Sequence, residues 1–306
     1  MKLIFKKIIR IFSDKEHRYN FLNARGFSRF ISSEKLLKIR YYARFGQELN
    51  LNAPTKYTEK LQWLKVYDQN PDYTLMVDKY EAKKLVAEKI GEEYVVPLLG
   101  VWEQAEDIDF ESLPEQFVLK TTHDSGGYVI CQQKSKLDYD DVIRTMKKNL
   151  NRNYYIGSRE WPYKNVKPRV IAEKYMEDES DGELRDYKFF TFGGVPKVLY
   201  ITQSRGKDEV TVADFYDMNF EHLPFTIDHD MAKTPPHPPK NFELMKSLAS
   251  KLSENTPQLR VDFYEVNGKV YFGEMTFFHC SGLESFHPKE WDEIFGEWLK
   301  LPEKNI

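Results

Sequence analysis

The strongest constraint on the fold is a pair of strand-like runs that flank Asn267-Gly268. Asn-Gly between alternating apolar residues is the best short-range signal for a tight β-hairpin, because both residues accept a positive φ. Side chains alternate across a strand, so Asp262 is expected on the face opposite Val261 and Phe263. The chain is therefore predicted to contain antiparallel sheet near its C-terminal end.

Each arm of this hairpin supplies a carboxylate near the open end, Asp262 on the first strand and Glu274 on the second. Two oxygen donors that converge on one point suit Mg²⁺ held between a protein and nucleotide phosphates. The alternative is a pair of acidic residues on a solvated sheet face. The hairpin alone does not decide between these interpretations.

Length and composition limit the classes of protein that the chain can belong to. Its 306 residues suffice for two domains or one large α/β unit with lobes. A hydrophobic content of 41%, with 21 Phe and 19 Tyr, supports a sizeable core. The net charge of −3 argues against a nucleic-acid-binding protein, because those show a basic excess. The two cysteines, Cys131 and Cys280, lack metal-ligand spacing and are expected as reduced thiols in a cytoplasmic protein.

The N-terminal residues 1–12 are basic and amphipathic. No apolar run approaches the ~18–20 residues that span a bilayer, and the segment lacks the features of a cleavable signal. On a helix its apolar and basic side chains fall on opposite sides, a pattern that fits the surface of an anionic membrane. It fits equally a helix that packs on the protein with its basic side in water. We expect a cytoplasmic protein. If residues 1–12 bind a membrane, we expect the contact at the inner face of the cell membrane.

The periodicity of apolar residues predicts alternating regions of helix and strand. Residues 1 to about 75 read as helical. The expected helices are Ser32–Arg44, Thr58–Tyr67, Asp78–Gly91, Asp138–Asn151 and Phe242–Ser253. The expected strands outside the C-terminal hairpin are Tyr94–Trp102, Gln116–Thr122, one that begins at Tyr128, Arg169–Met176, Asp186–Phe192 and Val195–Gln203.

A small polar loop follows the strand that ends in Lys120 and contains Ser125, Gly126 and Gly127. Glycines allow backbone N–H groups to approach phosphate oxygens closely, and a lysine at the strand end adds a point charge. The loop is not a P-loop, because no Lys-Ser/Thr follows the glycines. The alternative is a β-hairpin with a flexible loop and an ordinary surface lysine.

This ordered set of motifs resembles the ATP-grasp superfamily, and within it the TupA-like branch associated with teichuronopeptide and capsular polysaccharide biosynthesis. The likeness extends from about Asp78 to Gly282. It implies an α+β fold in which two lobes clasp ATP, here preceded by a helical N-terminal lobe. The lobes are expected at residues 1–75 (helical, with the basic amphipathic start), 76–167 (small ATP-grasp lobe with the glycine loop) and 168–306 (large lobe with the hinge strand and the metal-binding hairpin).

The resemblance also implies roles for individual residues. The resemblance assigns nucleotide binding to Lys79, Lys120, Ser125, Gly126 and Gly127. It also assigns nucleotide binding to a hinge segment made of Glu173, Lys174, Tyr175 and Met176. Main-chain groups of that hinge would read the adenine edge, and an acid there would hold the ribose. The resemblance assigns Mg²⁺ binding to Asp262 and Glu274. Thr276 is expected to join them, at a position where many relatives have asparagine.

Four residues are expected to act on the reacting groups. Arg260 would stabilise an acyl phosphate, or it pairs instead with a neighbouring acid. Lys188 takes the place of an arginine that faces the γ-phosphate in related ligases, and loses its bidentate geometry. His123 and His279 would orient substrate or accept a proton from an amine, or each is a hydrogen-bonded structural residue.

The resemblance implies an ATP-dependent carboxylate–amine ligase in a capsule or cell-surface glycan setting. The expected substrates are a sugar carboxylate and an amine or amino acid, with ATP and Mg²⁺ as cofactors, and association with polysaccharide-synthesis glycosyltransferases is a further expectation. One alternative is a sugar-modifying glycosyltransferase, although the sequence has no Rossmann-like nucleotide-sugar turn. A second is a nucleotide-binding scaffold without catalysis, and a third is a kinase that stops at phosphorylation.

Overall fold

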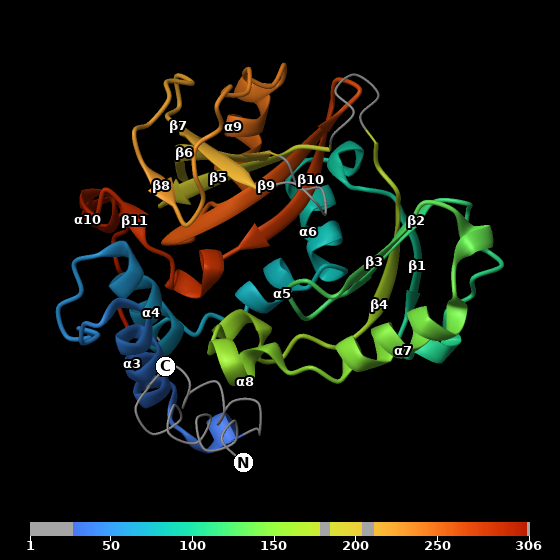
Figure 1. Ribbon diagram of the computed structural model, residues 1–306, viewed down its shortest axis with the longest axis horizontal. Helices are drawn as coiled ribbons and strands as arrows, with labels where there is room; N and C mark the ends of the chain where they lie inside the picture. The colour runs from blue at the N-terminus through green and yellow to red at the C-terminus, as the bar shows by residue number, and fades with distance from the viewer. Residues whose placement is uncertain (1–26, 178–183, 204–210, 305–306) are drawn as a thin grey trace, which may run out of the picture.

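The computed structural model describes residues 27–177, 184–203 and 211–304 (Figure 1). The amphipathic segment 1–12 lies outside the described residues, so its contact with a membrane stays a prediction. Among the described helices none is long and apolar enough to cross a membrane. Cys131 is buried and Cys280 is exposed, and both thiols are free.

Two antiparallel sheets form the framework of the molecule. The larger has the order β10-β9-β5-β6-β7, with β5 at Asp186–Phe192, β6 at Val195–Gln203, β7 at Val212–Tyr216, β9 at Gln258–Val266 and β10 at Lys269–Thr276. The smaller has the order β1-β4-β2-β3, with β1 at Leu98–Trp102, β2 at Phe117–Thr121, β3 at Tyr128–Cys131 and β4 at Val170–Lys174. A two-stranded pair joins β8 (Thr226–Ile227) to β11 (Phe286–His287). Figure 1 shows the two main sheets apart, with α5 (Tyr73–Val77) and α6 (Glu81–Ile90) between them.

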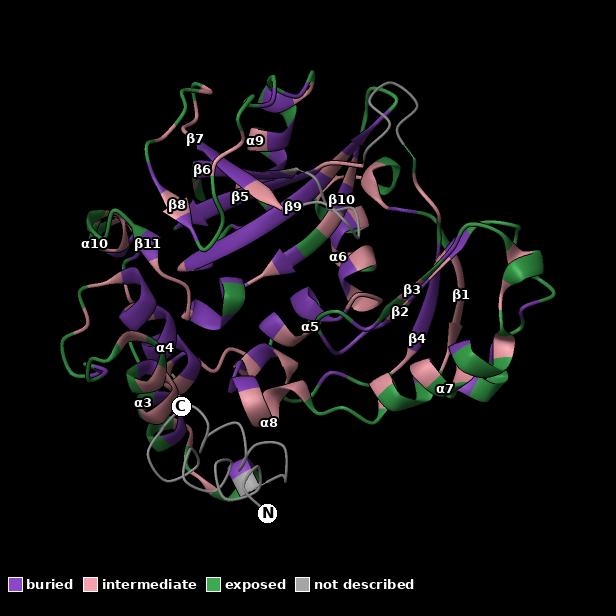
Figure 2. Ribbon diagram, viewed as in Figure 1, coloured by how far each residue is buried: buried purple, intermediate pink, exposed green. Residues whose placement is uncertain are grey.

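The predicted hairpin of β9 and β10 is confirmed. Asn267 and Gly268 have φ values of 50° and 77°, as a two-residue turn with positive φ at both positions requires. Strands β5 and β9 are almost wholly buried (Figure 2). Both faces of β5 are covered, since Phe189 packs against Phe242 on one side and Phe190 and Phe192 pack against Phe295 on the other. The hairpin is therefore held rigidly at the centre of the molecule.

The N-terminal helices α3 (Ser33–Phe45) and α4 (Tyr57–Tyr67) occur where the sequence predicts them. Ser32 caps α3, and Gly46 ends it with a φ of 67°. Helix α4 packs against α10 (Glu290–Trp298) near the end of the chain. Gly296 permits this approach, since a Cβ there would meet the Thr55 carbonyl oxygen at 2.1 Å.

Aromatic side chains pack these helices against the larger sheet. The ring centroid of Tyr57 lies 5.9 Å from that of Phe192 and 5.4 Å from that of Phe295. Side-chain and main-chain polar contacts support the packing, since Thr58 bonds Asp292 through its N–H and its hydroxyl. Lys60 Nζ donates to the carbonyl oxygens of residues 296 and 299 at 2.8 and 2.9 Å. The helical N-terminal region thus shares one hydrophobic core with the larger sheet.

The smaller sheet has a separate core on one face, against α7 (Tyr139–Leu150). Phe117 and Leu119 on β2 and Met146 on α7 are fully buried there. Strand β4 pairs with β1 and β2 in this sheet, although the predicted lobe boundary at residue 168 precedes it. The lobe boundaries themselves stay a prediction.

Most predicted elements are found within a few residues of their expected limits. The strand expected at Tyr94–Trp102 begins only at Leu98, because Pro97 cannot donate a ladder hydrogen bond and a 3₁₀ turn occupies Glu92–Tyr94. The helix predicted at Phe242–Ser253 is confirmed as α9 (Phe242–Leu252). The sequence reasoning did not identify β7, the β8–β11 pair, α10 or the short helix α8 (Tyr154–Ser158). The architecture is α+β, as expected.

Candidate active site

A β-bulge places the two predicted metal-binding carboxylates opposite one another. Pairing of β9 with β10 is regular up to Phe272 and Phe263, and the register then shifts so that Glu274 faces Asp262. Without the shift Glu274 would pair with Val261 and share its buried face, because cross-strand partners point to the same side. Gly273 is the extra residue that turns the Glu274 carboxylate toward the Asp262 side.

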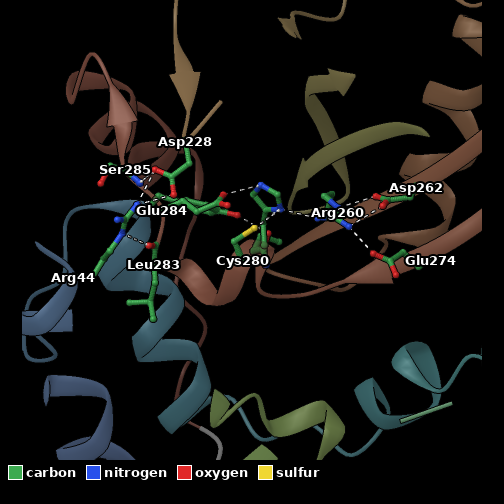
Figure 3. Close-up of polar contacts among 12 residues, drawn as sticks. Arg44, Asp228, Arg260, Asp262, Glu274, Cys280, Leu283, Glu284 and Ser285 are labelled. Carbon is green, nitrogen blue, oxygen red and sulfur yellow. Dashed lines mark hydrogen bonds and ion pairs between the residues drawn. The ribbon is translucent and has the colours of Figure 1, made fainter. Parts of the chain in front are cut away.

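Arg260 lies between these two carboxylates (Figure 3). Its Nε donates to Asp262 Oδ1 at 2.8 Å, and its Nη2 donates to Asp262 Oδ2 at 2.7 Å and to Glu274 Oε1 at 2.6 Å. Burial would lower the pKa of Arg260, but Asp262 and Glu274 outweigh it and raise that pKa above its ordinary value. Thr276 donates its hydroxyl to Glu274 Oε1 at 2.9 Å. The expected pairing of Arg260 with neighbouring acids is therefore present in this structure.

Lys188 on β5 is the cross-strand partner of Asp262. Its Nζ lies 2.7 Å from Asp186 Oδ2 and 3.2 Å from Asp262 Oδ2, and all three side chains are buried. The ammonium group thus neutralises two carboxylates of the same sheet face. A role of Lys188 toward a γ-phosphate stays a prediction.

The residues at this edge fit a divalent cation by the chemistry of their donors. Asp262 is buried, whereas the side chain of Glu274 is 46% exposed and reaches the interior between the lobes. Burial would raise the pKa of Glu274, but Arg260, Lys79 and Lys188 lower it below its ordinary value, so the carboxylate is ionised at neutral pH. Two carboxyl groups with an adjacent hydroxyl form the hard oxygen set that Mg²⁺ binds.

The smaller sheet carries a second charged cluster, formed by Glu173, Lys83 and Lys120. Lys83 Nζ lies 2.6 Å from Glu173 Oε1, and Lys120 Nζ lies 2.5 Å from Glu173 Oε2. Burial would raise the pKa of Glu173, but the ammonium groups of Lys120 and Lys83 lower it to about 2. The Glu173 carboxylate is thus engaged by two lysines, and any contact with a ribose stays a prediction.

An exposed apolar surface lies on the same face of the smaller sheet as Lys120. Tyr128 on β3 is the cross-strand partner of Lys120, and Ile130 is the partner of Val118, which in turn pairs with Glu173 on β4. Tyr128 is 57% exposed and Ile130 is 51% exposed. The opposite face of β2 is the buried one that packs on α7. A flat apolar surface beside a lysine is the environment that holds a nucleotide base.

The glycine loop between β2 and β3 is closed by a compact hydrogen-bond network. Thr121 donates its N–H to the Gly127 carbonyl oxygen at 2.8 Å and its hydroxyl to Asp124 Oδ1 at 2.5 Å. A Cβ at Gly127 would meet Thr121 Oγ1 at 2.2 Å, so only glycine fits there. Ser125 and Gly126 are exposed at the tip, and Gly126 has a φ of 83°.

Lys79 contacts this loop and feels the charge of Glu274. Its Nζ donates to the Asp124 carbonyl oxygen. Burial lowers the pKa of Lys79, and the charges of Glu274 and Asp124 oppose that effect. The ammonium group therefore lies within electrostatic reach of Glu274 on the other sheet. The structure thus places Lys79 against the glycine loop, and its predicted role in nucleotide binding stays a prediction.

The hinge residue Lys174 is the last residue of β4, and Tyr175 and Met176 follow it. The N–H of Lys174 donates to the Pro97 carbonyl oxygen at 3.0 Å, and the Tyr175 hydroxyl accepts a hydrogen bond from Gln132 Nε2 at 2.9 Å. Lys174 is exposed, whereas Tyr175 and Met176 are half-buried. Their predicted contact with adenine is not tested by these positions.

The two histidines occupy different surroundings. His123 is buried in the glycine loop, its Nε2 lies 3.0 Å from the Arg152 carbonyl oxygen, and burial lowers its pKa. His279 is buried beside Arg260, and its Nδ1 lies 2.6 Å from Arg260 Nη1. Burial lowers the pKa of His279, while Glu284 opposes the effect, so the ring is neutral at neutral pH.

Sequence reasoning missed two charged residues of these clusters, Lys83 and Glu284, and it gave Asp186 no role separate from that of Lys188. Lys83 lies on the side of α6 that contacts the smaller sheet. The sequence pattern that could have indicated its role is a lysine placed among apolar residues of a helix. Asp186 lies two residues before Lys188, and their period-2 spacing places both on one strand face. Glu284 has no such signal, because its position depends on the loop after β10.

The family of this chain is decided by a sequence comparison. The model of the family described as TupA-like ATPgrasp matches residues 59–300. The chain belongs to the TupA-like ATP-grasp family. This is a family of the ATP-grasp fold, which is typical of ATP-dependent carboxylate–amine ligases. No curated protein matches the sequence.

Solved structures of ATP-grasp ligases are similar to this chain at low identity. A D-alanine–D-alanine ligase from Bacillus anthracis in complex with ATP is 18% identical with a TM-score of 0.40, over 66% of this chain and 55% of that one. The D-alanine–D-alanine ligase from Helicobacter pylori is 13% identical with a TM-score of 0.41, over 89% and 68%. The ATP-grasp ligase PsnB, complexed with its minimal precursor, is 9% identical with a TM-score of 0.38, over 71% and 60%. The match to the first of these spans 55% of its length.

Proposed function

We propose that this TupA-like ATP-grasp protein is an ATP-dependent ligase that joins a sugar carboxylate to an amine or amino acid through an acyl phosphate. The observation that supports this most is the cross-strand pair of Asp262 and Glu274, together with the positive charge of Lys79, which lowers the pKa of Glu274. Paired carboxylates opposite lysines are suited to hold a nucleotide triphosphate with its cation.

The proposed reaction has two steps. A carboxylate oxygen of the sugar attacks the γ-phosphorus of ATP, and the bond from that phosphorus to the bridging oxygen breaks to release ADP. The amine nitrogen then attacks the acyl carbon, and inorganic phosphate leaves with the electron pair of the C–O bond. The nitrogen loses a proton, and the product is an amide.

The residues of the two sheets would divide the work of positioning and of charge neutralisation. Tyr128 and Ile130 offer the surface for the base, and Lys120 and Lys79 offer positive charge to the phosphates. Asp262 and Glu274, with Thr276, would hold Mg²⁺, which when bound neutralises phosphate charge. Arg260 would then turn its guanidinium toward the oxygens of the acyl phosphate.

The substrate class rests on the family name alone. TupA-like proteins are associated with teichuronopeptide and capsular polysaccharide biosynthesis, so we infer a uronic acid as the carboxylate substrate. The proposed setting is the inner face of the cell membrane, beside the glycosyltransferases of polysaccharide synthesis, with residues 1–12 as the membrane contact. Tyr155, Trp161 and Tyr163 are the aromatic residues that we propose to lie nearest the sugar.

Release of ADP by purified protein tests the proposal. The assay contains ATP, Mg²⁺, a uronic acid and a panel of amino acids, and mass spectrometry identifies the amide. Asp262→Asn and Glu274→Gln should each abolish ADP release, because each removes a charged donor of the cation. Glu111→Gln, at an exposed loop position, is the matched control and should leave turnover unchanged.

The other functions give different results in the same assay. Tight ATP binding without ADP release across the panel would indicate a nucleotide-binding scaffold. Release of ADP without an amide would indicate a kinase. Unchanged turnover in Asp262→Asn and Glu274→Gln would contradict the assignment of the cation site.

A further inference from the structure

We propose that His279 and Glu284 are positioning residues that hold Arg260 at the cation-binding carboxylates, an inference that rests on the proposed function of Arg260. The contacts run in series from the loop after β10 to the hairpin (Figure 3). Glu284 Oε2 lies 3.1 Å from His279 Nε2, and His279 Nδ1 lies 2.6 Å from Arg260 Nη1. These contacts join side chains of the protein to one another and involve no substrate atom.

The chemistry of the three side chains determines where the protons lie. A guanidinium group has only donors, so the Nδ1 of His279 must accept from Arg260 and carries no proton. The proton of the neutral ring is therefore on Nε2, which lies 3.1 Å from Glu284 Oε2, so the negative charge of that carboxylate stabilises it there. Glu284 selects the one tautomer of His279 that can bind Arg260.

Arg260 needs such a tether because its other partners are the residues that would bind the cation. Its Nε and Nη2 donate to Asp262 and Glu274. A divalent cation on those carboxylates would take their lone pairs and repel the guanidinium group. The contact of Nη1 with a neutral imidazole nitrogen is not subject to that competition. His279 thus keeps Arg260 beside the site when the carboxylates bind metal.

The backbone on both sides of Glu284 is held by an ion pair from the N-terminal helices. Arg44 on α3 donates its Nε to the Leu283 carbonyl oxygen at 2.7 Å and pairs with Asp228 at 2.6 Å. Asp228 Oδ1 in turn accepts from the Ser285 N–H at 3.3 Å. The carboxylate of Glu284 therefore projects from a segment that is fixed before and after it.

The segment that bears His279 is fixed from a second direction. His279 begins the 3₁₀ turn η6 (His279–Gly282), in which Cys280 and Ser281 have φ values of 43° and 60°. Lys65 Nζ and Gln62 Nε2, both from α4, donate to the Ser281 carbonyl oxygen at 2.8 and 3.0 Å. Two non-glycine residues with positive φ persist only where neighbours hold them, and here α4 does so.

Substitution of His279 separates a positioning role from simple packing. In His279→Asn the side-chain oxygen stands at the place of Nδ1 and can still accept from Arg260, whereas His279→Leu fills the space without an acceptor. We expect kcat for ADP release to fall about tenfold to a hundredfold in His279→Leu. His279→Asn should recover most of that loss, and the KM for ATP should change little in both variants. Glu284→Gln, which keeps an acceptor for Nε2–H, should retain more activity than Glu284→Leu.

A spectroscopic measurement tests the pair without reference to turnover. In ¹⁵N-histidine-labelled protein the signal absent from His279→Asn belongs to His279, and it should show protonated Nε2 and bare Nδ1. A protonated Nδ1 in the wild type would overturn the inference, as would equal kcat in His279→Leu and His279→Asn. Failure of the wild type to release ADP with any acceptor would refute the proposed function instead. The tautomer of His279 would still show whether His279 accepts a hydrogen bond from Arg260. Thermal unfolding of each variant shows that it is folded.

Discussion

Replacement of Glu173 by glutamine tests the electrostatics of the smaller sheet. The carboxylate is 6% exposed and contacts Lys83 and Lys120, and its pKa falls from 4.5 in its ordinary state to about 2. A difference of about 2.5 units at 1.36 kcal/mol each corresponds to about 3 kcal/mol of folding free energy. Removal of one partner from a buried charge cluster costs a similar amount, since the remaining ammonium groups lose their counter-charge.

The sign of the pH dependence follows from the direction of the shift. A carboxyl group whose pKa is lower in the folded state stabilises the fold fully above its unfolded pKa of about 4.5. That stabilisation is lost progressively as the pH falls toward about 2, where the folded carboxyl takes up its proton. The difference between wild type and Glu173→Gln should therefore shrink below about pH 4.5.

Urea unfolding followed by circular dichroism at pH 7 and near pH 3 measures this difference. We expect Glu173→Gln to be less stable by about 3 kcal/mol at pH 7 and by clearly less near pH 3. The control is Glu103→Gln, which removes an exposed ion pair with Lys167 and should leave the midpoint unchanged. A loss below about 1 kcal/mol at pH 7, or an equal loss at both pH values, would refute the reasoning.

Four further changes have definite expected outcomes. Gly127→Ala should weaken binding of a fluorescent ATP analogue, because its Cβ would meet Thr121 Oγ1 at 2.2 Å and displace the glycine loop. Phe295→Ala removes a fully buried ring and should cost about 3–5 kcal/mol in urea unfolding. Gly268→Ala imposes a Cβ on a residue with a φ of 77° and should cost about 1 kcal/mol, which a thermal melt detects. Chelation of Mg²⁺ by EDTA should stop ADP release and excess Mg²⁺ should restore it; release that persists in EDTA would contradict a role for the cation.

Local sequence patterns predict the elements of this fold well where one residue type decides the geometry. Asn267-Gly268 predicts the hairpin because few other pairs accept positive φ at both positions. The caps of α3 follow from Ser32 and Gly46 for a similar local reason. Helix α10 was missed because it packs through Phe295 and Trp298 on partners far away in the sequence.

The candidate site was predicted in its parts and not in its geometry. A regular hairpin would have turned Glu274 to the Val261 face, and only the bulge at Gly273 corrects this. The sequence does carry a signal of this bulge, because Gly273 interrupts the strand and the buried apolar positions change phase from Val270 and Phe272 to Met275. The contacts from Glu284 through His279 to Arg260 depend on a loop conformation that α3 and α4 impose. The spacing of these residues in the sequence therefore could not predict them.

The packing of α4 on α10 has a consequence for biosynthesis. Thr58 and Asp292 bond to one another across 234 positions of the chain. While the ribosome is still making α10, the side of α4 that will face it has no partner. Helix α4 therefore leaves the exit tunnel well before it reaches its final environment, and a nascent chain stalled before residue 290 would present the apolar side of α4 to chaperones.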